Sequence, residues 1–207
     1  MGLLNLLFKN PIAFIIIAVP LMYAIIFHEL AHGYVAYRMG DPTARNQGRL
    51  TLNPLKHLDP MGTLMLFIVG FGWARPVPVN FGYIRDFRKG MVLVSSAGII
   101  ANIILAFLAL FIYSALSISP NSMPALLLYS FARINIILAA FNLIPIPPLD
   151  GSKILMGFAP KHVQVFLMKL ERFGFLIVIG LLFLGVLDPV IDFLQWLILS
   201  FINLLLP

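Results

Sequence analysis

The sequence predicts an α-helical polytopic membrane protein with four to six membrane helices, and with a small β element and a re-entrant segment between the first two spans. Its 207 residues are 61% hydrophobic and 11% charged, and their mean hydropathy of +1.00 lies far above that of soluble domains. The basic residues are concentrated between the apolar runs, as they are in the cytoplasmic loops of membrane proteins. We therefore attribute the net charge of +6 to membrane topology and expect no nucleic-acid partner.

We predict membrane spans from the length of apolar runs, because roughly 20 residues are needed to cross a bilayer. They lie at residues 11–37, 91–116, 125–146 and 173–187, and residues 190–206 either span or lie at the interface. Lys and Arg are frequent in residues 38–90 and 151–172, so we expect these segments in the cytoplasm and the uncharged residues 117–124 outside. The sequence thus predicts a multi-pass protein of the cell membrane, in a prokaryotic plasma membrane, embedded in the lipid bilayer.

The region between the first two predicted spans carries the β element and the re-entrant segment. Two stretches alternate with the period of a β-strand, "RLTLN" at residues 49–53 and "PVPVN" at residues 76–80. Between them, "GTLMLFIVGFGW" at residues 62–73 is apolar but too short to span comfortably. No internal repeat or low-complexity linker divides the chain, so we expect a single domain over residues 1–207.

A polar motif, "HELAH", lies in the first predicted span and consists of His28, Glu29, Leu30, Ala31 and His32. On a helix, imidazoles four residues apart project from the same face, close enough to hold one ion, and neutral imidazole is a preferred zinc ligand. Ionisable groups at mid-bilayer cost roughly 2.5 to 3.5 kcal/mol and usually mark function. The motif therefore predicts one Zn²⁺ per chain, the alternative being a cluster of hydrogen bonds between helices.

A zinc hydrolase needs a third protein ligand and leaves the fourth position for water. His57 and His162 lie in basic, loop-like stretches, where we expect solvated or interfacial side chains. Asp150 in "NLIPIPPLDGSK" follows prolines that interrupt the third predicted span, and the predicted topology brings it to the depth of His28 and His32. Asp150 is therefore the candidate ligand, the alternative being an ordinary turn aspartate before glycine.

Together these motifs resemble the site-2 protease family of intramembrane zinc metalloproteases, in its short form, over most of the chain. The resemblance implies that His28, His32 and Asp150 bind zinc and that Glu29 is the catalytic residue. It further implies that the substrate is a transmembrane protein, cleaved in regulated intramembrane proteolysis. The chain departs from the family at "GIIAN", which keeps Gly98 and Asn102 of a G-P-x-x-N pattern but has isoleucine where proline is expected.

The predicted function is thus that of a zinc metalloendopeptidase that hydrolyses a peptide bond within or near a substrate's transmembrane segment. We expect its catalytic core at about residues 11–157 and its C-terminal membrane helices at about residues 173–206. One alternative is a related protease that takes Glu171 as its third ligand. The other is a metal transporter or metal-binding protein with the same ligands, although a transporter would usually show an internal repeat or several carboxylates within the membrane.

A substrate helix that is unwound in lipid loses its own backbone hydrogen bonds, so the enzyme must offer replacement partners, and we look for these among the residues near the site. An exposed strand edge could do so, and residues 49–53 are favoured over 76–80 because prolines lack donors, which points to the backbone of Leu50 or Leu52. The amides of Asn142 and Asn102 are further candidates for holding the substrate, the alternative being hydrogen bonds between helices.

Overall fold

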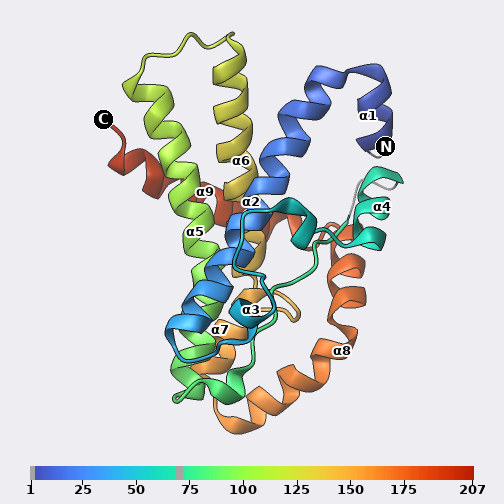
Figure 1. Cartoon of the computed structure of the whole chain (residues 1–207), viewed down its shortest axis with the longest axis vertical. Helices are drawn as coiled ribbons and strands as arrows, with labels where there is room; N and C mark the ends of the chain where they lie inside the picture. The colour runs from blue at the N-terminus through green and yellow to red at the C-terminus, as the bar shows by residue number, and fades with distance from the viewer. Residues whose placement is uncertain (1–2, 69–71) are drawn as a thin grey trace.

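The computed structural model describes residues 3–68 and 72–207, and the regular elements of these residues are all helices (Figure 1). In chain order they are α1 (Leu3–Lys9), α2 (Pro11–Arg38), α3 (Thr43–Asn46), η1 (Pro54–Lys56), α4 (Pro60–Ile68), η2 (Phe81–Tyr83), α5 (Phe87–Ala115), α6 (Met123–Leu143), α7 (Asp150–Phe158), α8 (Lys161–Phe183) and α9 (Asp188–Leu205).

Four helices of the described residues, α2, α5, α6 and α9, are long and apolar enough to cross a membrane. The predicted class, an α-helical polytopic membrane protein with four to six membrane helices, is therefore confirmed in its helical character, with four candidate spans among the described residues. The predicted span at residues 173–187 is not among these four, because its first part forms the second half of α8, a helix whose first half carries Lys161, Lys169 and Arg172. Residues 190–206 form most of α9, which has the length and composition of a span.

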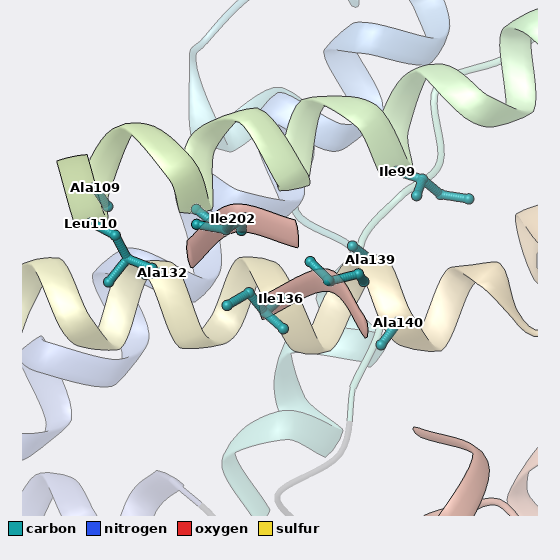
Figure 2. Packing of buried hydrophobic residues seen from close by; sticks show 10 residues of the cluster. Ile99, Ala109, Leu110, Ala132, Ile136, Ala139, Ala140 and Ile202 are labelled. Atoms are coloured by element: carbon teal, nitrogen blue, oxygen red, sulfur yellow. The ribbon is translucent and has the colours of Figure 1, made fainter. Parts of the chain in front are cut away.

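Three long helices form the centre of the bundle. Helices α5 and α6 lie side by side as an antiparallel pair, α2 packs against both, and α9 packs against α6 (Figure 1). Small side chains such as Ala109, Ala132 and Ala139 are almost inaccessible at the meeting of α5, α6 and α9, and Ile136 and Ile202 fill the space between them (Figure 2). Small residues let membrane helices approach closely, so this packing fixes the positions from which the polar side chains project.

The predicted β element is not formed. Residues 49–53 and 76–80 contain no strand, and the β contact of the described residues is a single antiparallel bridge between Leu58 and Ala74. The prolines in "PVPVN" remove two of the N–H donors that a ladder would need. The alternation of residues in these two stretches therefore belongs to irregular segments with buried and exposed side chains. The prediction of strands was wrong.

The predicted re-entrant segment, residues 62–73, is described only in part, because residues 69–71 lie outside the described residues. Its first half belongs to α4, a nine-residue helix. A helix of this length does not by itself support the prediction that the segment enters the membrane and returns to the same side.

Candidate metal centre

Three candidate ligands meet where α7 reaches α2. His28 and His32 lie one turn apart on α2, and Asp150 is the first residue of α7. The Oδ2 atom of Asp150 lies 3.1 Å from the Nε2 atoms of both histidines, and the two Nε2 atoms lie 2.9 Å apart. All three side chains are buried, with exposed fractions of 7% to 8%. The structure thus brings together the three residues that the sequence predicts as ligands.

The proton on each imidazole is located by its hydrogen bond on the other side of the ring. His32 Nδ1 lies 2.7 Å from the carbonyl oxygen of Val94, which can only accept, so Nδ1 carries a proton and Nε2 of the neutral ring has the lone pair. His28 Nδ1 lies 2.6 Å from Oδ1 of Asn102. That amide is oriented by its Nδ2 atom, which donates to the carbonyl oxygen of Ala24, so His28 also has its proton on Nδ1.

When both rings are neutral, three lone-pair atoms therefore face one another, and the Oδ2 atom of Asp150 is buried without a hydrogen-bond donor. This arrangement is repulsive unless a proton or a metal cation lies among the three atoms. Zinc bound at about 2.0 to 2.1 Å in a tetrahedral site places its ligand atoms about 3.3 Å apart, close to the separations found here. Two imidazoles and one carboxylate thus fit Zn²⁺ and leave one position open.

Two glycines allow the helices to come this close. A Cβ atom on Gly98 of α5 would lie 2.5 Å from Nε2 of His32, so only glycine lets α5 pass beside the imidazoles. A Cβ atom on Gly151 would lie 2.3 Å from the carbonyl oxygen of Leu143, so glycine also lets the start of α7 approach the end of α6. Both glycines position ligands without contacting a metal.

A chain of amides connects His28 to α6. Asn102 is fully buried, and its Nδ2 atom also donates to Oδ1 of Asn135 at 2.7 Å. Asn135, likewise fully buried, donates from Nδ2 to the carbonyl oxygen of Phe131 at 2.8 Å. A hydrogen bond to the ring nitrogen that does not face the metal fixes the tautomer and orientation of a histidine ligand, so this chain makes Asn102 a positioning residue for His28. Such a buried position leaves its amide no access to a substrate.

Glu29 lies beside the candidate ligands in the wall of a cavity of about 510 Å³. One of its carboxylate oxygens, Oε2, accepts a hydrogen bond from the backbone N–H of Val77 at 2.7 Å. The other oxygen makes no hydrogen bond with the described residues. The same cavity is lined by His28, His32 and Asp150, so Glu29 can contact a water molecule or a peptide group that approaches them.

The loop beside Glu29 is fastened by a buried arginine. The guanidinium of Arg49 donates to the carbonyl oxygen of Arg75 at 2.7 Å. Burial and then the charge of Arg75 lower the pKa of Arg49, while the charge of Glu29 raises it. Arg49 thus provides positive charge near Glu29 and holds residue 75 in place.

The remaining predicted site residues lie at different distances from the ligands. Asn142 lines the cavity and donates to the carbonyl oxygen of Leu138 at 3.0 Å. Leu50 and Leu52 are not in the wall of this cavity, which is formed by Pro76, Val77 and Val79 instead. The segment at residues 76–79 is therefore nearer to the candidate metal centre than residues 49–53 are.

The two further histidines and the alternative ligand Glu171 are not part of the metal cluster found among the described residues. His162 is exposed, whereas His57, which we expected to be solvated or interfacial, is 1% exposed, and its Nε2 atom lies 2.8 Å from the carbonyl oxygen of Thr51, so it is not solvated. Two residues of the site were not predicted from the sequence. Asn135 could have been found as an amide in the middle of an apolar run, whereas no feature of the sequence points to Val77.

Comparison with known proteins agrees with this geometry. The family model described as "Peptidase family M50" matches residues 118–185. "Putative zinc metalloprotease YwhC" of Bacillus subtilis is 42% identical over 170 residues, covering 78% of this chain and 77% of the relative. "Putative zinc metalloprotease Rip2" of Mycolicibacterium smegmatis is 31% identical over 179 residues, covering 82% and 67%. "Zinc metalloprotease MJ0392" of Methanocaldococcus jannaschii is 26% identical over 153 residues, covering 74% and 37%. No solved structure gives a significant match.

Replacing the carboxylate ligand should empty the site. Asp150→Ala removes one of three ligands, so zinc measured by mass spectrometry should fall from about one per purified chain to almost none. His162→Ala, which changes an exposed histidine, is the matched control and should retain zinc, as should His57→Ala. An Asp150→Ala protein that keeps its zinc while His57→Ala loses it would contradict the ligand assignment.

Cutting the amide chain should weaken zinc binding without removing a ligand. Asn102→Leu and Asn135→Leu should lower zinc affinity by about 10- to 100-fold, with the larger loss for Asn102→Leu, which deprives His28 of its partner. Competition with a chromophoric chelator measures the affinity, and the visible spectrum of the Co²⁺-substituted protein reports ligand geometry. Asn203→Leu on α9, where the asparagine is exposed, is the control. Variants with lowered thermal stability but unchanged zinc affinity would show that the chain serves packing alone.

Proposed function

The chain belongs to peptidase family M50, the site-2 protease family, and is a zinc metalloprotease; we propose that it hydrolyses a peptide bond within or near the transmembrane segment of a membrane protein. The observation that carries this proposal is the convergence of His28, His32 and Asp150, buried among membrane helices, on the cavity that contains Glu29. A substrate that reaches these residues must come from the membrane or from its edge.

The proposed mechanism assigns one role to each side chain. His28, His32 and Asp150 would hold a single Zn²⁺, which when bound supplies a Lewis acid that lowers the pKa of water toward about 7 and polarises a carbonyl group. Glu29 accepts the proton of the attacking water through its free oxygen as the new C–O bond forms. Glu29 then returns this proton to the leaving amine nitrogen as the C–N bond breaks.

The backbone N–H group of Val77 positions Glu29 for proton transfer. It donates to Oε2 of Glu29, so the carboxylate cannot rotate freely, and Oε1 of Glu29 remains available for proton transfer. General acid–base groups act within hydrogen-bond reach of the proton that they transfer, so a fixed carboxylate is an advantage. Val77 is therefore proposed as a positioning residue that acts through its backbone.

We assign the substrate-binding segment to residues 76–79 and Asn142 in place of Leu50 and Leu52. No helix or turn interrupts residues 75–80, and the N–H group of Val79 makes no hydrogen bond with the described residues. Val79 lines the catalytic cavity, so its N–H group lies close to the space that a substrate would enter. An extended substrate can pair with that group, and Asn142 offers its side chain from the opposite helix.

The protein is a membrane protein, as its apolar helices and its family indicate. We propose that it resides in a plasma membrane, with residues 38–90 and 151–172 and the catalytic cavity toward the cytoplasm, on the strength of its Lys and Arg distribution. We further propose a single domain over residues 1–207, with a catalytic core at about residues 11–157 and C-terminal helices at about residues 173–206.

Removal of the base should separate metal binding from catalysis. Glu29→Gln keeps the size of the side chain and all three ligands, so zinc should stay near one per chain while cleavage of a single-span substrate falls by about 10² to 10⁴ or more. Cleavage is followed by gel electrophoresis and mass spectrometry of purified protein in lipid. Undiminished cleavage by the Glu29→Gln protein would refute the mechanism. Zinc transport into vesicles without any cleavage by the unmodified protein would support a transporter instead.

A proline at the pairing position should impair substrate binding. Val79→Pro removes the one N–H group proposed to pair with the substrate, so turnover should fall about tenfold with zinc retained, as expected for a buried hydrogen bond. Gly or Pro residues that weaken the substrate helix should partly restore turnover. Leu52→Pro changes an exposed residue away from the cavity and should have little effect. A large loss with Leu52→Pro and none with Val79→Pro would return the assignment to residues 49–53.

A further inference from the structure

A charged residue, Arg133, lies in the middle of a candidate spanning helix and has no partner among the described residues. Arg133 is the eleventh of the 21 residues of α6, which is one of the four candidate spans. Its side chain is exposed, and it makes no hydrogen bond or ion pair with the residues that the structure describes. Ionisable residues within a membrane are costly and usually mark a site of function, so a group outside the described chain is expected to pair with Arg133.

The depth of Arg133 restricts what that group can be. Ten residues of α6 lie on either side of it, a distance of about 15 Å to each end of the helix at 1.5 Å per residue. An arginine side chain can reach the interface only from near a helix end. The phosphates of lipids lie at the interface, so a lipid headgroup is poorly placed to pair with Arg133. A carboxylate on another transmembrane segment is well placed.

An apolar cavity of about 540 Å³ reaches α6 one helical turn from Arg133, at Ile137. Its walls come mainly from α2, α4 and α6, and Ile137, Leu138 and Phe141 form the α6 wall. Arg133 precedes Ile137 by four residues, so the two side chains share one face of α6. The arginine therefore stands one helical turn beyond the α6 wall, toward Met123.

This apolar cavity adjoins the catalytic cavity along two chain segments. On α6 the wall passes from Phe141 of the apolar cavity to Asn142 of the catalytic cavity. On α2 it passes from Ile26 to His28. A transmembrane segment that packs its side chains into the apolar cavity would thus come close to the catalytic cavity at His28 and Asn142.

We propose that the apolar cavity docks the transmembrane segment of the substrate, and that Arg133 selects segments that carry a carboxylate facing it. The inference rests on the proposed function and adds a specificity determinant to it. Arginine and carboxylate form a strong, geometrically specific pair, and neither group is then left unpaired in the membrane. An entirely apolar segment leaves Arg133 without a partner.

The position of the selected carboxylate follows from the geometry of α6. Arg133 and Asn142 are nine residues apart, or about 14 Å along the helix. A substrate helix with the same rise per residue and its scissile bond near Asn142 would place its acidic residue about nine residues from that bond. In the proposed topology this residue lies on the outward side of the cleavage site.

The test is an acid scan in a single-span model substrate. The span consists of Leu and Ala with a Gly-Pro pair near one end, its cleavage site is mapped by mass spectrometry, and a single Asp is then moved along it from about the fifth to the thirteenth residue on the outward side. The unmodified enzyme, purified in lipid vesicles, should cleave the substrate with Asp near position nine about tenfold faster than the apolar substrate, as expected for a close charge pair away from water. Substrates with Asp at other positions should be cleaved no faster than the apolar substrate.

Variants of the enzyme decide whether Arg133 is responsible. Arg133→Leu should abolish the preference for Asp while retaining zinc, and Arg133→Glu should prefer Lys at the same position. Arg172→Leu removes an exposed arginine of α8 and should leave the preference unchanged. Zinc content and thermal stability show that each variant is folded.

The outcomes separate this inference from the proposed function. Absence of cleavage of every substrate by the zinc-loaded enzyme would refute the proposed function itself. Cleavage with no dependence on the Asp position, or a dependence that persists in Arg133→Leu, would overturn the docking proposal alone. The docking proposal would also be overturned if Arg133→Leu changed the protein from a dimer to a monomer without changing its substrate preference. Arg133 would then pair with a second copy of the chain.

Discussion

The Nε2 atoms of His28 and His32 and the Oδ2 atom of Asp150, enclosed among apolar helices, impose the constraint on which the rest of this structure depends. These three atoms lie within about 3 Å of one another, and a proton or a metal cation among them relieves the repulsion of their lone pairs. The arrangement requires α2 to carry both imidazoles on one face, α5 to pass close enough to bind their Nδ1 protons, and α6 to end so that α7 can begin at Asp150. Four helices must therefore keep these relative positions for the three atoms to meet.

The loop between the first two spans is fixed by carboxylates of α2 and of the turn that follows it, and not by a sheet. Glu29 accepts the N–H of Val77 at 2.7 Å, and the fully buried Asp41 accepts the N–H of Asn80 at 2.6 Å. These two bonds hold both ends of the segment along α2, so the segment can be irregular and still form a defined wall of the catalytic cavity. Hydrogen bonds to charged groups are stronger than those between neutral groups, which suits a loop with two prolines.

Four of the spans and the grouping of the three candidate metal ligands could be predicted because each depends on a pattern local in the sequence. Apolar length predicts a membrane helix, and two histidines four residues apart on a helix with one carboxylate after a break in another helix predict a metal site. Asn135 and Val77 could not be predicted, since their roles arise only when α6 and the loop pack against α5 and α2. The strands failed for a related reason: alternation in "PVPVN" reflects which residues face α2, and alternation alone does not supply a hydrogen-bonding partner. His57 was misplaced because a basic neighbourhood in the sequence does not determine burial.

The two adjoining cavities suggest how a substrate helix could be opened at low cost. Within the apolar cavity the walls offer few hydrogen-bonding groups, so a substrate segment there must keep its own helical hydrogen bonds. In the catalytic cavity the side chain of Asn142 and the N–H of Val79 can replace some of these bonds. On the proposed function, a substrate therefore stays helical up to the boundary between the cavities and becomes extended beyond it. Cleavage at that boundary requires the helix to unwind only near the scissile bond, where Asn142 and Val79 offer hydrogen bonds that lipid cannot offer.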